Sequence, residues 1–322
     1  MEHASPECPS RPSRTLSGKV ALVTGAGAQG DGIGNGRAIA ILLAEDGASV
    51  VCVDRVLALA QRTVAMIEDG GGGGPTKGDR VPGKAIAVEA DVTSEPDCQR
   101  IVDTALSTFG RVDILCNNVG IMGATGPATE LDTAQWAQGL EVNVTSMMLM
   151  ARCAIPAMLK NDTAAVEAGH PSGSIRGSIV NLGSVAGLQG GTPHLLYPTA
   201  KGAVVNMTRA MAAHHGRDGI RVNCVCPGER FPHPTSSLLL APLSLTTPGS
   251  PGSTGMLYTP MMYHSGMSAE MRERRRNRSL LRTEGNAWDC ASAVRFLAGD
   301  EARWITGTVL TVDAGATAAG FV

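Results

Sequence analysis

Short apolar runs alternate with helix-like segments along most of the chain, and this alternation limits the folds open to it. Residues 20–24 read VALVT and residues 49–54 read SVVCVD. Runs that are apolar without interruption and rich in Val or Ile are typical of strands buried on both faces. When such strands alternate with helices, the expected arrangement is a parallel sheet covered by helices on both sides.

We therefore expect an α/β fold, a single doubly wound Rossmann domain whose parallel sheet has about seven strands. Strands are expected at residues 20–24, 49–54, 85–93, 112–120, 178–184, 220–228 and 307–313. Helices are expected at residues 36–48, 56–70, 96–110, 135–160, 197–215 and 288–299. Residues 1–16 are expected to form a flexible tail, and the domain to span 17–322 with an atypical insertion at 229–255.

Composition argues against several classes of function. The chain has 322 residues, a formal net charge of −2 and 3% aromatic side chains, so neither nucleic acid nor a membrane is an expected partner. No apolar stretch is long enough to span a bilayer, and the N-terminus lacks the apolar core of a secretory signal. The eight cysteines have no metal-binding spacing. We expect buried free thiols, no metal site and a cytoplasmic location.

A glycine-rich turn follows the first expected strand. Its sequence, TGAGAQGDGIGNG at residues 24–36, holds six glycines. Such a turn lets the backbone approach a pyrophosphate, and the N-terminus of the following helix favours negative charge. Two patterns overlap, because Gly25, Gly27 and Gly30 form a GxGxxG while Gly32 and Gly34 offer a second pair. We expect Gly25, Gly32 and Gly34 to face the phosphates, and Gly30 to let the loop turn.

Asp54 ends the second expected strand, twenty residues after Gly34. A carboxylate in this place can accept hydrogen bonds from the adenosine ribose and would repel a 2′-phosphate. NAD is therefore favoured over NADP, although Arg55 could offset the repulsion. Asp31, inside the glycine-rich turn, would repel a pyrophosphate, so we expect it to point to solvent or to cap the helix.

Tyr197 and Lys201 stand four residues apart, and hence on one face of an expected helix. A tyrosine with an ordinary pKa of about 10 is a poor acid/base at neutral pH, and a neighbouring ammonium together with a bound cationic nicotinamide would lower that pKa. Ser184 ends a strand thirteen residues upstream, where its hydroxyl could hold a substrate oxygen. Asn143 lies inside a helix, where Asn is unfavourable, so it is expected to bend the helix or to hold a water molecule.

With these motifs the chain resembles the short-chain dehydrogenase/reductase family. The resemblance runs from about residue 17 to residue 315 and includes DVT at Asp91, NNVG at Asn117, PG at Pro227 and TP at Thr259. It implies catalytic roles for Asn143, Ser184, Tyr197 and Lys201. It implies cofactor contacts from Gly25, Gly32, Ile33, Gly34, Asp54, Asp91, Val92, Asn118, Tyr197, Lys201, Pro227, Gly228 and Thr259.

The same resemblance implies how the catalytic residues act. Tyr197 would be the acid/base, and Lys201 would bind the nicotinamide ribose and lower the tyrosine pKa. Ser184 would position the reacting oxygen, and Asn143 would complete a water-linked proton relay. The cofactor would be NAD or NADP. The partners would be a small alcohol or ketone and further copies of the chain, in a homotetramer or dimer built on the two long helices.

One segment departs from the family pattern. Family members usually place a threonine a few residues after the PG pair, whereas Gly228 and Thr259 are thirty residues apart here. Without residues 229–255 the chain reads VNCVCPGMLYTPMM, which fits the pattern. The segment is rich in Pro, Ser, Leu and Thr and shows no periodicity, a composition that rarely packs. Two origins remain open: a retained intron, which sequencing the transcript would test, or a genuine insertion beside a substrate lid.

The expected reaction interconverts a secondary alcohol and a ketone by hydride transfer, with Tyr197 handling the hydroxyl proton. Two alternatives are an NADP-dependent 3-oxoacyl-thioester reductase, and a nucleotide-binding protein whose catalysis the 229–255 segment impairs. A methionine-rich lid around residues 256–271 and the loop at 121–135 would shape the pocket. Their composition favours a neutral, fairly apolar substrate.

Overall fold

All seven strands lie side by side in one parallel sheet. The computed structural model describes residues 11–70, 83–161, 175–190, 194–228, 268–277 and 279–318. The strand order is β3-β2-β1-β4-β5-β6-β7, and every neighbouring pair is parallel. The order reverses between β1 and β4, which is where an open α/β sheet binds its ligand. The predicted α/β fold is confirmed.

The strands are β1 (Val20–Thr24), β2 (Ser49–Asp54), β3 (Ala85–Glu89), β4 (Ile114–Asn117), β5 (Gly177–Leu182), β6 (Ile220–Pro227) and β7 (Val309–Val312). The α-helices are α1 (Asn35–Glu45), α2 (Leu57–Glu68), α3 (Glu95–Phe109), α4 (Thr133–Leu140), α5 (Ser146–Met158), α6 (Leu196–His215), α8 (Ala269–Arg276) and α9 (Ala287–Ala298). Short 3₁₀ turns lie at Val185–Gly187, Gly216–Asp218 and Asp300–Ala302, and a π-helix at Glu141–Thr145.

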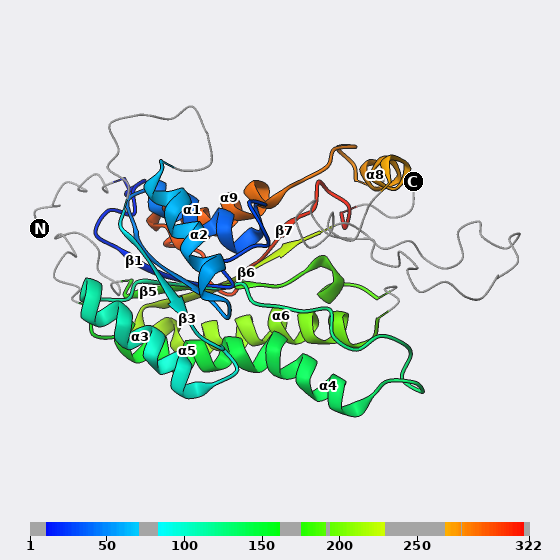
Figure 1. Cartoon of the computed structure of the whole chain (residues 1–322), viewed down its shortest axis with the longest axis horizontal. Coiled ribbons are helices and arrows are strands. Elements are labelled where there is room, and N and C mark those ends of the chain that lie inside the picture. Colours follow the sequence, from blue (N-terminus) through cyan, green and yellow to red (C-terminus); the bar gives the residue numbers. More distant parts are fainter. Residues whose placement is uncertain are drawn as a thin grey trace, which may run out of the picture.

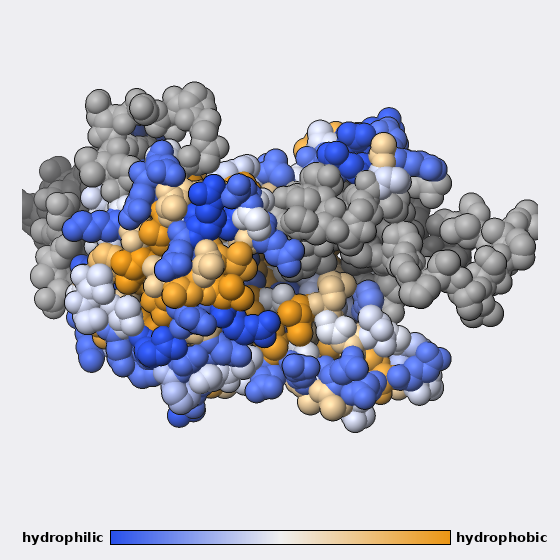
Figure 2. Space-filling model, viewed as in Figure 1, coloured by the Kyte–Doolittle hydropathy of each residue, from blue (hydrophilic) through white to orange (hydrophobic). Residues whose placement is uncertain are grey.

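Helices cover both faces of the sheet (Figure 1). Helices α1, α2 and α9 lie above the sheet, and α3, α5 and α6 lie below it. Alternate residues of a strand point to opposite faces, so Ala21 and Val23 of β1 join the core under α1 and α9. Val20 and Leu22 join the core formed with α3 and α5. Figure 2 shows apolar side chains exposed around α2 and the edge strand β3, with hydrophilic side chains around them.

Several expected element boundaries shift in the structure. The strand expected at 85–93 ends at Glu89, because the next residues turn and Asp91 Oδ1 accepts the Thr93 N–H at 2.9 Å. The helix expected at 135–160 is interrupted, since the π-helix Glu141–Thr145 separates α4 from α5. Asn143, which was expected to bend the helix or to hold a water molecule, lies within this π-helix.

The packed part of the chain begins earlier than expected. Leu16, the last residue of the expected tail, is buried in the core, and its N–H donates to Asp46 O at 2.8 Å. The carbonyl of Arg14 accepts a hydrogen bond from Arg295. Leu16 therefore belongs to the folded domain. Residues 1–10 and the segment 229–255 lie outside the described residues.

The seven described cysteines are buried and free, as predicted. Burial raises the pKa of Cys52, Cys98 and Cys290 to about 12, so these thiols stay protonated at neutral pH. Cys224 and Cys226 face the same side of β6, as their alternation predicts, with their sulfurs 3.7 Å apart. Within the described ranges no group of three or more His, Cys, Asp or Glu side chains could hold a metal ion.

Candidate active site

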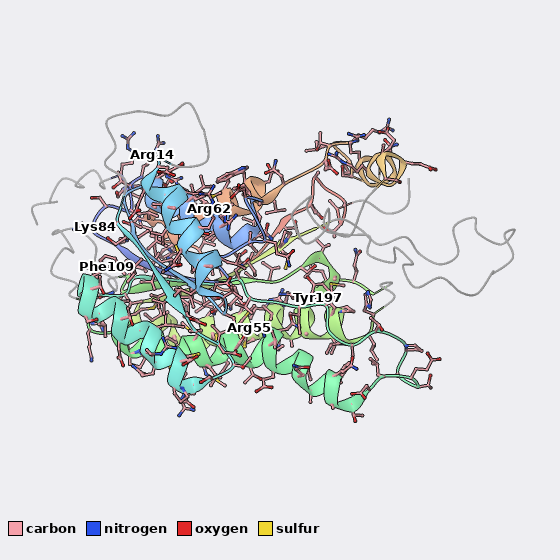
Figure 3. The ribbon with its side chains drawn as sticks, viewed as in Figure 1. Arg14, Arg55, Arg62, Lys84, Phe109 and Tyr197 are labelled. Atoms are coloured by element: carbon pink, nitrogen blue, oxygen red, sulfur yellow. The ribbon has the colours of Figure 1, made fainter. Side chains whose placement is uncertain are left out.

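The predicted site residues follow the carboxyl ends of several strands or begin the neighbouring helices. Figure 3 shows Arg55, just after β2, and Tyr197, on α6, toward one end of the sheet. Lys84, just before β3, and Phe109, at the end of α3, lie toward the other end. Parallel strands bring these distant segments together because all their carboxyl ends meet at one edge.

Tyr197, Ser184 and Lys201 come together at the end of β5. Tyr197 is only partly buried as a residue, but its hydroxyl lies deep among its neighbours and hydrogen-bonds with Ser184. The Lys201 Nζ lies 5.8 Å from the centre of the Tyr197 ring and donates to Leu182 O at 2.8 Å. Ser184 Oγ accepts the Ala186 N–H at 3.1 Å, which starts the short 3₁₀ turn after the strand. The predicted four-residue spacing thus places both side chains beside Ser184.

Burial shifts the two titratable groups of this cluster in opposite directions. Desolvation raises the pKa of Tyr197 above its ordinary value of 10.0, and the hydrogen bond with Ser184 opposes the rise. Burial lowers the pKa of Lys201 from 10.5 to about 8. Both shifts are toward the neutral form, as expected for groups removed from water, although at neutral pH Lys201 still carries its proton. Lys201 is not among the influences that set the Tyr197 pKa here, and the predicted lowering, which also needs a bound cationic nicotinamide, stays a prediction.

Asn143 is fully buried in the π-helix. Its Nδ2 donates to Gly139 O at 2.8 Å and to Ile121 O at 3.0 Å, and its Oδ1 accepts the Ile121 N–H at 3.0 Å. A Cβ added to Gly120 would lie 3.0 Å from Asn143 Oδ1 and 3.2 Å from Lys201 Nζ. The side chains of Asn143 and Lys201 therefore flank one small space, which a water molecule could occupy.

The glycine-rich turn makes close contacts that only glycines allow. Gly25 has a φ of +63°, and a Cβ there would lie 3.0 Å from Asn118 Nδ2. Gly27 donates its N–H to Asp54 Oδ2 at 3.0 Å, and a Cβ there would lie 2.5 Å from the same oxygen. Gly30 has a φ of +56° in open space, so the prediction that it lets the loop turn is confirmed. The three glycines of the GxGxxG thus serve separate structural needs.

Helix α1 begins after the second glycine pair, at Asn35, with Gly34 as its N-cap. Gly36, which neither glycine pattern of the sequence singled out, is the most crowded glycine of the turn. A Cβ on Gly36 would lie 2.0 Å from Gly25 O and 2.6 Å from Asn118 Nδ2. The repeated spacing Gly32-x-Gly34-x-Gly36 could have pointed to it. Gly32 and Ile33 precede the helix and lead the chain into its N-terminus.

Asp54 and Asp31 occupy different environments. Asp54 Oδ1 accepts the Val56 N–H at 3.0 Å, while its Oδ2 is bonded to Gly27. The carboxylate is therefore fixed next to the glycine-rich turn. Asp31 is exposed and pairs with Arg62 of α2 at 2.8 Å. Of the two predicted options for Asp31, the solvent-facing one is confirmed, and Gly34 takes the cap position.

The remaining predicted cofactor residues lie at neighbouring strand ends. Asp91 and Val92 lie in the turn after β3, where Asp91 N donates to Asp97 Oδ2 at 2.8 Å. A hollow of about 450 Å³ beside them is lined by Arg55, Glu89, Ala90, Asp91, Asp97 and Arg100. Pro227 ends β6, and Gly228 follows with a φ of +137°. Asn118 Nδ2 donates to Thr24 O and Gly25 O. Thr259 lies outside the described residues.

These features fit a dinucleotide. Gly25, Gly27 and Gly36 let the turn pack tightly against its neighbours at places where a Cβ would collide, and a helix N-terminus follows it. A fixed carboxylate stands at the end of the next strand. The catalytic cluster lies after β5, across the point where strand order reverses. The fold and site define a nicotinamide-dependent α/β enzyme with a Ser–Tyr–Lys cluster.

Comparison with known proteins agrees with this class, and the chain belongs to the short-chain dehydrogenase/reductase family. The family model described as "short chain dehydrogenase" matches residues 19–230. A second one, described as "Enoyl-(Acyl carrier protein) reductase", matches residues 253–317. The stretch between the two matches lies within the segment 229–255, whose origin stays a prediction.

Similar proteins include named alcohol dehydrogenases. 2-(S)-hydroxypropyl-CoM dehydrogenase 3 of Xanthobacter autotrophicus is 35% identical over 306 residues, covering 95% of this chain and 99% of the relative. Meso-2,3-butanediol dehydrogenase of Serratia marcescens is 30% identical over 300 residues, covering 93% and 95%. A solved 7α-hydroxysteroid dehydrogenase, complexed with NADH and 7-oxo glycochenodeoxycholic acid, is 29% identical with a TM-score of 0.72, covering 94% and 95%.

The chain is thus an NAD(P)-dependent oxidoreductase of this family that acts on CH–OH groups. The relatives favour alcohol and ketone interconversion over the two alternatives, thioester reduction and nucleotide binding without catalysis. In the part of the chain that the structure describes, every helix is too short or too polar to span a bilayer.

Proposed function

We propose that the enzyme oxidises a neutral, fairly apolar secondary alcohol to its ketone, or reduces the ketone, and that it prefers NAD. The observation that carries this proposal is the Tyr197 hydroxyl, bonded to Ser184 beside Lys201. On the segments that follow β4 and β5, the apolar side chains of Ile121, Leu188 and Leu195 are each about two-fifths exposed. Their loops are joined by a β-bridge between Gly126 and His194. Exposed apolar side chains on these segments favour substrates without charge.

Each catalytic side chain then has a defined part. Tyr197 accepts the hydroxyl proton when the alcohol is oxidised and returns it in the reverse direction. Ser184 holds the reacting oxygen near the phenol. Lys201 would hold the nicotinamide ribose, and Asn143 would complete a water-linked proton relay. The nicotinamide, when bound, supplies the acceptor or donor of the hydride.

The loop around the substrate supports this substrate class. Residues 121–132 contain two acidic side chains, Glu130 and Asp132. Both are exposed, and Asp132 caps α4 by accepting the Gln135 N–H at 2.8 Å. Neither is buried beside Tyr197, so the described part of this loop offers no charged anchor for a substrate.

The preference for NAD rests on Asp54. Its carboxylate is held against the glycine-rich turn by two backbone N–H groups, where it would accept hydrogen bonds from the adenosine ribose and repel a 2′-phosphate. Arg55 and Arg100 line the neighbouring hollow and could partly offset that repulsion. The expected preference is therefore a moderate one.

Asp54→Asn tests this preference because it removes the charge and keeps the shape. The ratio of the NADPH and NADH dissociation constants should fall by about tenfold. Arg62→Gln is the matched control, since it changes the charge of the same surface at an exposed ion pair. An unchanged ratio in Asp54→Asn would rule out the ribose role.

An absorbance screen tests the reaction itself. Panels of secondary alcohols and ketones, charged and neutral, are incubated with NAD(H) or NADP(H) while the nicotinamide absorbance is followed. Neutral apolar members should give turnover, and Tyr197→Phe should abolish it. Full activity in Tyr197→Phe would contradict the proposed acid/base role.

The same family membership suggests the assembly and location. We expect a homotetramer or dimer built on the helices that carry Asn143 and Tyr197, and a cytoplasmic enzyme. Light scattering coupled to gel filtration measures the first, and fractionation of the source cells measures the second.

A further inference from the structure

Arg37 is the largest fully buried side chain in the structure, with no exposed surface. It lies in the first turns of α1, directly after the glycine-rich turn. Its Nη2 donates to Ala28 O at 3.0 Å, and its Nη1 donates to Gly30 O at 2.9 Å and to Gly32 O at 2.6 Å. One guanidinium therefore holds three alternate carbonyls of the loop that the pyrophosphate would approach.

This arrangement determines where the intervening N–H groups point. All peptide bonds among the described residues are trans, and in a trans peptide the carbonyl and the following N–H point in opposite directions. Because Arg37 draws these carbonyls inward, the N–H groups of Gln29, Asp31 and Ile33 face away from it. None of the three donates to an acceptor among the described residues. Backbone N–H groups without a protein acceptor can donate to an anion that approaches the loop.

A second residue completes the arrangement from α2. The Arg37 Nε donates to Thr63 Oγ1 at 3.0 Å, and Thr63 Oγ1 donates to Ala26 O at 2.8 Å. Both side chains are fully buried. The positive φ of Gly30 lets the chain double back so that its carbonyl can reach the guanidinium. The loop is thus fixed to both α1 and α2 from beneath.

We infer that Arg37 is a positioning residue of the dinucleotide site. Its guanidinium holds the extended glycine-rich turn in the shape that presents the N–H groups of Gln29, Asp31 and Ile33 to the cofactor pyrophosphate. Its positive charge, buried beneath the loop, also favours a bound dianion. The exposed Asp31 does not oppose this field, because it pairs with Arg62. The inference rests on the dinucleotide binding proposed above.

The test measures dissociation constants for NADH, by nucleotide fluorescence, and for ADP-ribose, by competition. Arg37→Met should weaken both by about tenfold or more, because charged hydrogen bonds that shape the site are lost. Arg37→Lys keeps the charge but cannot bridge all three carbonyls, so it should lie between wild type and Arg37→Met. Hydrogen exchange of residues 26–34 should rise in both variants.

Arg221→Met is the matched control. Arg221 is also a buried arginine that donates to backbone carbonyls, those of Leu297 and Gly299, but these carbonyls lie at the C-terminal end of α9. The Arg221→Met variant should be less stable than the wild type but keep its NADH affinity within about twofold of the wild-type value. Equal weakening in Arg221→Met and Arg37→Met would reduce Arg37 to a general stabilising residue and overturn the inference.

The remaining outcomes also decide the question. If Arg37→Met does not fold, Arg37→Lys decides, and an unchanged NADH affinity in that variant overturns the inference. If the wild type and the Arg37 variants bind NADH equally well, the proposed function is unaffected and only the positioning role of Arg37 is refuted. A wild-type protein that binds neither NADH nor NADPH overturns the proposed function and this inference together.

Discussion

Replacing the catalytic lysine by methionine should stabilise the cofactor-free protein while removing its activity. Lys201 is 4% exposed, and burial lowers its pKa from 10.5 to about 8. At neutral pH the folded protein must therefore hold an ammonium in surroundings that favour the neutral amine. Methionine has a similar length and no charge, so Lys201→Met removes this cost.

The size of the effect follows from the pKa. The difference between 10.5 and about 8, at about 1.4 kcal/mol for each pH unit, corresponds to about 3 kcal/mol. The hydrogen bond to Leu182 O is lost in the variant, which costs about 1 kcal/mol. The free energy of unfolding of Lys201→Met at neutral pH should therefore exceed that of the wild type by about 2 kcal/mol.

The dependence on pH has a definite sign. Below about pH 8 the lysine is protonated in the folded and unfolded states, so the whole penalty is present. Between about 8 and 10.5 the folded protein releases the proton while the unfolded chain keeps it, so wild-type stability gains as pH rises. Lys201→Met lacks this gain, and its advantage over the wild type should shrink toward high pH.

Urea unfolding followed by circular dichroism measures both quantities, near pH 7 and again near pH 9.5, on protein freed of nucleotide. Lys160→Met is the control, because Lys160 is exposed at the end of α5 and its replacement should leave the pH dependence of stability unchanged. If the difference in free energy of unfolding between Lys201→Met and the wild type is the same near pH 7 and near pH 9.5, the buried charge of Lys201 does not reduce stability as expected.

Three further substitutions probe the loop, the scaffold and the relay. Gly36→Ala places a Cβ 2.0 Å from Gly25 O and should weaken NADH binding by about tenfold or more. Gly216→Ala, in open space, should not. Arg221→Met leaves buried carbonyls unpaired and should lower the free energy of unfolding by about 3 kcal/mol in a urea titration. Asn143→Ala removes three hydrogen bonds to Ile121 and Gly139 and should reduce kcat about tenfold with NADH affinity unchanged.

The strands were predictable because a parallel sheet needs uninterrupted apolar runs, a strong signal within a short window. The residues at which the strands end were harder to predict, because there side-chain hydrogen bonds to the local backbone compete with continuation of the sheet. β3 stops at Glu89 because Asp91 binds the Thr93 backbone and side chain instead of continuing the ladder. Residue type indicated that Asn143 is special within its helix, but its partner Ile121, which supplies both a donor and an acceptor, lies on another segment and could not be identified from the sequence.

Site residues could be predicted where their spacing along a single helix or strand determines their geometry. They could not be predicted where the geometry depends on contacts between segments that are brought together by folding. Tyr197 and Lys201 share a helix face by their spacing alone. Gly36 was missed because its crowding arises from Gly25 O, a contact made by folding the turn back onto the helix. The rise of the Tyr197 pKa in the protein without cofactor was not visible in the sequence either, since the depth of burial is a property of the packed structure.

Burial raises the pKa of Tyr197 and lowers the pKa of Lys201, and this pair of shifts has a consequence for catalysis. Alcohol oxidation needs a phenolate, which the protein alone disfavours. The pKa of Tyr197 should therefore fall when a positive charge is brought next to it, as the oxidised nicotinamide does, and less so with the neutral reduced form. The chain has only three tyrosines, so ultraviolet absorbance of tyrosinate, corrected with Tyr197→Phe, can follow this one. An equal Tyr197 pKa in the NAD and NADH complexes would show that the cofactor charge does not control the base.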